Sequence, residues 1–174
     1  MSKARSSTAD ALERYEGQAA FGEAINLLGC ALPHPEGRNF QGHRGAHTLS
    51  TAVRFAVHCR RRLELKSAPN DNNLCCALEF EGDFARGACA LNLKQALHQL
   101  IHNDHVLISD VRATFKNNSK GAVHFQKQFF DSRKKASAVV MKVTTPERDA
   151  MIIPLVVMLD AYFLLLPGGE SLEK

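Results

Sequence analysis

Residues 105–143 read HVLISDVRATFKNNSKGAVHFQKQFFDSRKKASAVVMKV and decide the fold class. Apolar and polar side chains alternate over His105–Lys116, as they do in a strand with one buried face. The run NNSKG at 117–121 predicts a turn, and further strands follow over Ala122–Phe130 and Ala138–Val143. Short connections between successive strands favour antiparallel pairing. This stretch therefore predicts an antiparallel sheet.

Two more strands and a helix are predicted just before this stretch. Leu74–Phe80 and Phe84–Cys89 are short strands joined at the Gly-Asp pair 82–83, which is a hairpin signal. Asn92 opens a helix that runs to about His102, because Asn is a preferred N-cap and the apolar residues that follow lie on one helical face.

The first third of the chain is less decisive. Residues 1–7 are expected to be a flexible arm, and Thr8 caps a helix that runs to about Leu28. Residues 30–47 are rich in Gly and Pro and predict a long loop. Residues 48–66 fit both a helical stripe and a strand alternation, and their β-branched and aromatic content favours a strand in the second half.

The C-terminal apolar run Met151–Leu166 contains Pro154 and Asp160. A helix needs about 20 apolar residues to cross a bilayer. We therefore expect a buried core element here and no membrane partner. Pro154 suits the first turn of a helix over residues 155–166.

One domain of the α+β class is the expected fold. The chain has 174 residues, the size of an ordinary single domain, and residues 8–174 are assigned to it. A mostly antiparallel sheet is packed by an N-terminal, a middle and a C-terminal helix. A sheet of five strands with one helix between the third and the fourth is also the order of an OB-like barrel, which is an alternative form for this sheet.

The positive charge of the chain is concentrated in one stretch. The whole chain has 22 Lys and Arg against 18 Asp and Glu, a net charge of +4. Residues 112–142 alone hold eight positive side chains and one acid, a net charge of +7, so the remainder is at −3. A second basic cluster lies at Arg60, Arg61 and Arg62. Segregation of this kind favours a polyanionic partner.

Aromatic rings within the basic stretch make single-stranded nucleic acid the expected ligand. Lys and Arg neutralise phosphates, while bases stack on exposed rings. We predict a non-enzymatic nucleic-acid-binding protein that contacts phosphates and bases through a hairpin over residues 112–135 and through the arginine cluster. Phe125 and Phe129 are the stacking candidates. The interface residues are Arg60, Arg61, Arg62, Lys116, Lys120, Phe125, Lys127, Phe129, Arg133, Lys134 and Lys135.

Two alternative functions follow from other features. The first is a coat or nucleoprotein-type subunit that self-assembles around nucleic acid, with residues 151–166 and the N-terminal helix packed against neighbouring copies. The second is a small enzyme that uses His43 and His47 of the GHRGAH sequence. His98 and His102 have the spacing of two metal ligands on a helix, but no acid lies between them as a metalloprotease motif requires.

The cysteines point to a cytoplasmic protein. Their number is five and no CxxC pair is present, so neither a disulfide scaffold nor a zinc ribbon is indicated. We expect reduced thiols, several of them packed as small apolar side chains. No cofactor, metal or catalytic residue is assigned. The expected partners are single-stranded nucleic acid and further copies of the chain in a homo-oligomer.

Overall fold

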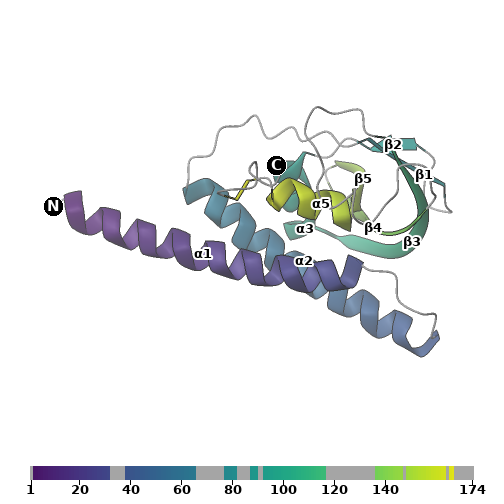
Figure 1. Ribbon diagram of the computed structural model, residues 1–174, viewed down its shortest axis with the longest axis horizontal. Helices are drawn as coiled ribbons and strands as arrows, with labels where there is room; N and C mark the ends of the chain where they lie inside the picture. Colours follow the sequence, from purple (N-terminus) through teal and green to yellow (C-terminus); the bar gives the residue numbers. More distant parts are fainter. Residues whose placement is uncertain are drawn as a thin grey trace, which may run out of the picture.

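The fold combines two long helices with a sheet and two short helices (Figure 1). The computed structural model describes residues 2–31, 38–65, 77–81, 87–89, 92–116, 136–146, 148–163 and 165–166. The elements in chain order are α1 (Ser2–Ala31), α2 (Arg38–Leu65), β1 (Ala77–Glu81), β2 (Gly87–Cys89), α3 (Leu93–Ile101), β3 (His105–Lys116), β4 (Ala136–Thr145), β5 (Arg148–Pro154) and α5 (Leu155–Phe163).

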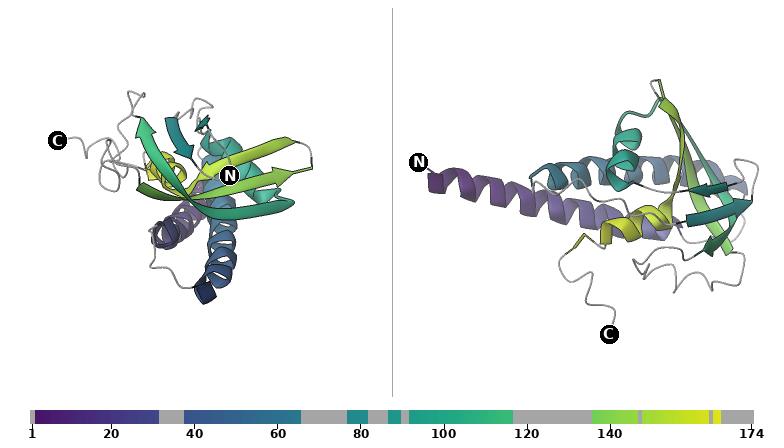
Figure 2. Two further views of the ribbon diagram at one scale, coloured as in Figure 1. Left: turned by 90° about the vertical axis from the view of Figure 1, so that its right-hand side faces the viewer. Right: turned by 90° about the horizontal axis from the view of Figure 1, so that it is seen from above.

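Helices α1 and α2 run antiparallel and pack against each other (Figures 1 and 2). Small side chains make up much of the buried face of the pair, and Ala20, Ala52 and Ala56 are fully buried. Because the distance between packed helices depends on the side chains between them, alanines allow a close approach. Phe55 extends this core toward α5. Its ring packs edge-on against that of Tyr162, with the ring centroids 5.1 Å apart.

Helix α2 corrects two expectations for the first part of the chain. The loop over residues 30–47 is wrong at 30–31, which end α1, and from Arg38 onward, where α2 begins. The strand favoured within residues 48–66 is also wrong, because α2 continues to Leu65. Five buried residues recur at helical spacing: Ala52, Phe55, Ala56, Cys59 and Leu63. Strand propensity is weak beside the burial of one continuous helical face.

Helix α1 is longer than its sequence signals indicate. It begins at Ser2 and ends at Ala31, so residues 2–7 of the expected arm are helical and Gly29 does not stop the helix. Gly17 and Gly22 each cost about 1 kcal/mol of helix propensity. The helix continues through both, because packing against other elements supplies most of a helix's stability in a protein.

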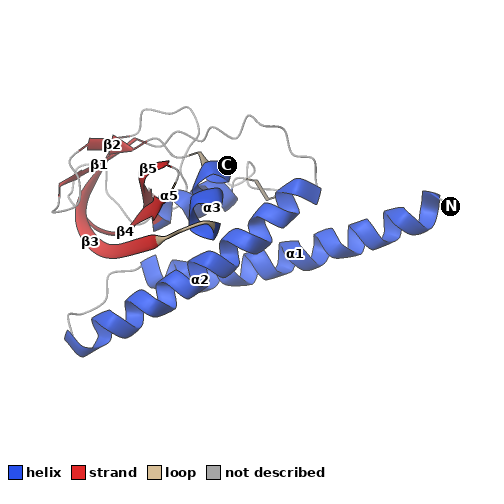
Figure 3. Cartoon of the chain, turned by 180° about the vertical axis from the view of Figure 1, so that it is seen from behind, coloured by secondary structure: helices blue, strands red, loops and turns tan. Residues whose placement is uncertain are grey.

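The strands form one antiparallel sheet in the order β2-β1-β3-β4-β5 (Figure 3). Strands β3 and β4 share the longest register, from His105 opposite Thr144 to Ala113 opposite Ala136. In the described residues the edge strands β2 and β5 do not pair with each other, so the sheet is open and the OB-like barrel is wrong. The barrel order required a strand within residues 48–66, which form α2 instead.

The predicted strands and helix in the middle of the chain are confirmed for the described residues. Strands β1 and β2 pair antiparallel, as expected of a hairpin, and β3 has the predicted bounds. Asn92 is the N-cap of α3, and its side-chain oxygen accepts a hydrogen bond from the backbone N–H of Gln95 at 3.1 Å. Strand β4 includes the predicted Ala138–Val143, while the predicted strand Ala122–Phe130 lies outside the described residues.

The apolar run Met151–Leu166 belongs to the core, as predicted, but it divides into two elements. Pro154 ends β5, and α5 begins at the next residue. Every residue from Leu155 to Tyr162 is buried. The sheet curves around α5 (Figure 1), which also packs against α1 and α3. This α+β arrangement buries α5 between the sheet and the helices.

Candidate nucleic-acid interface

The basic segment 112–135 begins in β3 and leads to β4. Strands β3 and β4 are neighbours, and their pairing ends at Ala113 opposite Ala136. Lys116, the last residue of β3, pairs with Ala77 of β1. Both ends of the connection over residues 117–135 therefore lie at the same end of the sheet. Seven of the predicted interface residues lie outside the described residues: Lys120, Phe125, Lys127, Phe129, Arg133, Lys134 and Lys135.

The arginine cluster lies in the last turns of α2, and its first member bonds to two neighbours. Arg60 Nε donates to Glu64 Oε1 at 2.8 Å, an ion pair four residues along the same helix. Its Nη1 lies 3.3 Å from Nδ1 of His98 on α3. A guanidinium has only donors, so this ring nitrogen accepts the hydrogen bond.

Arg61 contacts a buried acid on the other long helix. Its Nη1 lies 3.4 Å from Oε1 of Glu16, whose side chain is only 2% exposed. The second oxygen of Glu16 lies 2.6 Å from Nδ1 of His58. Arg61 itself is 63% exposed, so it contacts the Glu16 carboxyl from the solvent side. A buried carboxyl with two cationic or hydrogen-bonding partners fixes α1 against α2.

Arg62 is the most enclosed of the three, at 14% side-chain exposure. Its Nε lies 3.8 Å from Oε1 of Glu13 on α1. The side chain passes beside Gly17, where an added Cβ would lie 3.1 Å from Arg62 Nε. A glycine at this position leaves room for the arginine to cross α1.

The acids of α1 are partners of the basic residues of α2 that sequence reasoning missed. Glu13, Glu16 and Glu23 recur at helical spacing on the side of α1 that faces α2. Arg54 Nε donates to Glu23 at 2.7 Å, and this hydrogen bond lowers the pKa of the Glu23 carboxyl. The periodicity of the three acids, opposite basic residues on the next helix, is the signal that would have found them.

The arginine cluster lies away from the end of β3 (Figures 1 and 2). The C-terminal end of α2, which carries the arginines, lies on the side of α3 away from β1 and β2 (Figures 1 and 2). The end of β3 that leads into the basic segment pairs with β1. The described members of the predicted interface, the arginines and Lys116, are therefore not brought together (Figure 1).

The histidine motifs have a different setting from the one expected. GHRGAH is helical within α2, so His43 and His47 belong to a helix rather than to the expected loop. The rings of His98 and His102 lie 4.5 Å apart on α3. In the described part of the chain, no group of three or more metal-ligating side chains is assembled.

Cys30 and Cys59, the cysteines whose side chains the structure describes, are buried free thiols. Burial raises the pKa of Cys59 to about 12, against a smaller opposing effect of Arg62. A nucleophilic cysteine needs substantial thiolate character near neutral pH. Cys59 is therefore suited to packing and not to nucleophilic catalysis, despite the adjacent His58.

The sequence matches no family model, and neither a curated protein nor a solved structure is significantly similar to the chain. None of the helices in the described ranges is long and apolar enough to span a membrane.

Proposed function

We propose that this protein binds nucleic acid, with single strands preferred, through the basic segment 112–135. The observation that carries the proposal is the separation of charge along the chain. Residues 112–142 have a net charge of +7 in a chain whose total is +4. An excess of this size in one short stretch creates a local positive potential that attracts phosphates.

The topology of the sheet supports a localised binding surface. The basic segment connects two neighbouring strands, so its two ends are held at one end of the sheet. The described residues at the two ends of the segment, Lys116 and Ala136, lie in the neighbouring strands β3 and β4. Phe125 and Phe129 supply the rings on which bases would stack, a contact that contributes about 1–3 kcal/mol per base.

The arginine cluster has no part in the proposed binding surface. Each of its members contacts an acid of the same chain: Glu64, Glu16 and Glu13 in turn. Phosphate binding at these arginines would compete with those contacts. The binding mode we propose is therefore phosphate neutralisation and base stacking by the segment 112–135 alone.

Fluorescence anisotropy with labelled single- and double-stranded DNA and RNA tests this proposal. The triple substitution Arg133/Lys134/Lys135→Ala should weaken binding at least about tenfold, since three phosphate contacts would be lost. The matched control is the double substitution of Arg60 and Arg61 by Gln, which should change the affinity less than about twofold because these residues are engaged within the protein. Equal losses in both variants would contradict the proposed surface.

Self-assembly around nucleic acid is a second candidate, and one observation favours it. Large apolar side chains of α1 are exposed, with Tyr15 at 61%, Ile25 at 48% and Phe21 at 46%. Residues 155–162, by contrast, are buried in the protein's own core and are not available to a neighbour. Light scattering over a range of protein concentrations, with and without RNA, distinguishes a growing assembly from a particle of constant mass.

A further inference from the structure

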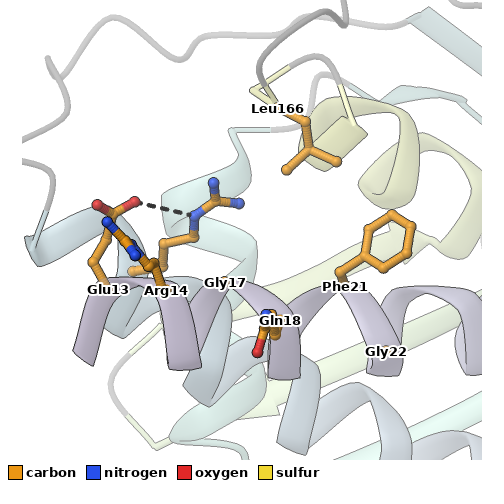
Figure 4. A pocket seen from close by; sticks show the side chains of 8 residues that line it. Glu13, Arg14, Gly17, Gln18, Phe21, Gly22 and Leu166 are labelled. Atoms are coloured by element: carbon orange, nitrogen blue, oxygen red, sulfur yellow. Dashed lines mark ion pairs between the residues drawn. The ribbon is translucent and has the colours of Figure 1, made fainter. Parts of the chain in front are cut away.

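A pocket of about 430 Å³ opens between the two long helices and the segment that follows α5 (Figure 4). Helix α1 supplies one wall, with Glu13, Arg14 and Phe21, while Arg62 of α2 and Leu166 line the opposite side. This volume is within the range of about 300–1,000 Å³ that is typical of small-molecule sites. None of the lining residues belongs to the basic segment 112–135.

The polar part of the pocket is a guanidinium that its own chain neutralises only weakly. Arg62 is 14% exposed, and its ion pair with Glu13 is 3.8 Å long (dashed line in Figure 4), too long for a hydrogen bond. Its Nε is buried without a hydrogen-bond partner in the described structure. Arg62 also acts on Tyr162: burial raises the pKa of the Tyr162 hydroxyl, and the charge and hydrogen bond of Arg62 oppose this rise. An enclosed cation with one unsatisfied donor favours the approach of an anion.

The apolar part of the pocket lies farther along α1. The side chains of Phe21 and Leu166 extend into the same space from opposite sides (Figure 4). Phe21 is 46% exposed, although its ring packs edge-on against that of Phe163, with the ring centroids 6.2 Å apart. Gly22 lies in the wall beside it, and a Cβ there would meet no atom within 4 Å. Because Gly22 has no side chain, α1 leaves room for a ligand at this point.

We propose that this pocket binds a small amphipathic anion, a monocarboxylate with an apolar body. The carboxylate would pair with the Arg62 guanidinium, which is suited to bidentate hydrogen bonding with such a group. Arg14 is a second cation at the rim, so two arginines and Glu13 give the lining a net charge of +1. The apolar body would lie between Phe21 and Leu166.

A titration of the ¹⁵N-labelled full-length protein with octanoate tests the site by NMR. Saturable shifts are expected at the side-chain Nε–Hε signal of Arg62 and at the backbone amides of Gly17 and Gly22. Octan-1-ol, which has the same chain without the charge, should bind at least tenfold more weakly. Equal binding of the two probes, or no saturable shift at these signals, would overturn the proposal.

Two variants remove the two halves of the site separately. Arg62→Met removes the charge, and Gly22→Leu fills the space beside Phe21; each should weaken octanoate binding at least tenfold. Gly22→Leu adds a side chain where open space is available and replaces a poor helix former, so this variant decides the question if Arg62→Met fails to fold. Octanoate affinity unchanged in Gly22→Leu would refute the pocket as the binding site.

The matched controls lie on the same helices outside the pocket. Arg60→Met removes a charge two residues before Arg62, and Gly29→Leu enlarges another glycine of α1 with open space around it. Both variants should bind octanoate as the unaltered protein does. If either control loses binding as completely as its partner variant, the effect is not specific to the pocket and the proposal is wrong.

Discussion

His58 Nδ1 lies 2.6 Å from Oε2 of Glu16, and this contact links the two long helices across the interior of their interface. Glu16 is 2% exposed, while His58 is 22% exposed. Arg61 approaches the other carboxyl oxygen at 3.4 Å. Both oxygens of the enclosed acid are thus contacted from α2, which is the arrangement that a buried carboxyl requires.

The first prediction concerns the loss of this acid. Glu16→Gln should lower the free energy of unfolding by about 1–3 kcal/mol, because the hydrogen bonds to a charged group are weakened in a buried place. Glu64→Gln, which removes a solvent-exposed pair on α2, should cost less than about 0.5 kcal/mol. Urea denaturation followed by circular dichroism measures both, and equal losses would argue against the role of Glu16.

The second prediction concerns pH. The hydrogen bond from Arg54 lowers the pKa of Glu23 below its ordinary value of 4.5. An acid with a lowered pKa in the folded state stabilises that state above its unfolded pKa, and this contribution is lost as the pH falls through the folded pKa. Glu23→Gln should therefore reduce the dependence of stability on pH below about pH 4.5. Urea midpoints at a series of acidic pH values test this; an unchanged slope in the variant would count against it.

The third prediction compares two glycines of α1. Gly22→Ala should raise the free energy of unfolding by about 0.5–1 kcal/mol, because alanine is the better helix former. Open space surrounds Gly22, whereas a Cβ at Gly17 would lie 3.1 Å from Arg62 Nε. Gly17→Ala should therefore gain less or lose stability, as Arg62 must move. Thermal unfolding of the two variants side by side provides the measurement. Identical gains in stability would contradict the prediction, because they would show that Arg62 moves away from residue 17 at no cost.

The fourth prediction concerns thiol reactivity. Because burial raises the pKa of Cys59 to about 12, this thiol should not react with iodoacetamide in the folded protein at about pH 8, where a free cysteine is partly thiolate. It should react once denaturant is added. Mass-spectrometric mapping of the modified peptides gives the result, and rapid alkylation of Cys59 in the native state would contradict the burial of α2's inner face.

The sequence predicted the elements whose local signals agree with their packing. Asn92 is a strong N-cap ahead of an amphipathic run, and α3 forms as expected. The alternation over His105–Lys116 likewise matches a strand that is paired on both sides. In these two places propensity, period and burial all favour the same structure.

Other elements were set by tertiary contacts that a local pattern does not contain. The glycines Gly42 and Gly45 indicated a loop, yet they lie in α2, where docking of the helix outweighs their low propensity. The apolar run after residue 150 carried no sign that β5 would pair with β4 before α5 begins. Helix α2 also includes residues 48–65, so the additional strand that a barrel required is not formed there.

Of the candidate site, the sequence predicted the distribution of charge but not the contacts of the charged side chains. The sequence shows the +7 excess over residues 112–142 directly. It does not show that Arg61 and Arg62 meet acids of α1, because those contacts join residues more than forty positions apart. The two basic clusters of the sequence therefore have different roles in this account: the segment 112–135 is proposed for binding, while Arg61 and Arg62 join α2 to α1.

The salt dependence of RNA binding tests the proposed function most directly. Anisotropy titrations of a labelled single-stranded RNA at a series of salt concentrations from about 50 to 200 mM should show affinity falling steeply. In Arg133/Lys134/Lys135→Ala the slope of log K against log salt should become shallower by about 2, the effect of three lost phosphate contacts on a single strand. No binding at low salt, or the same slope in the variant, would contradict nucleic-acid binding by the segment 112–135.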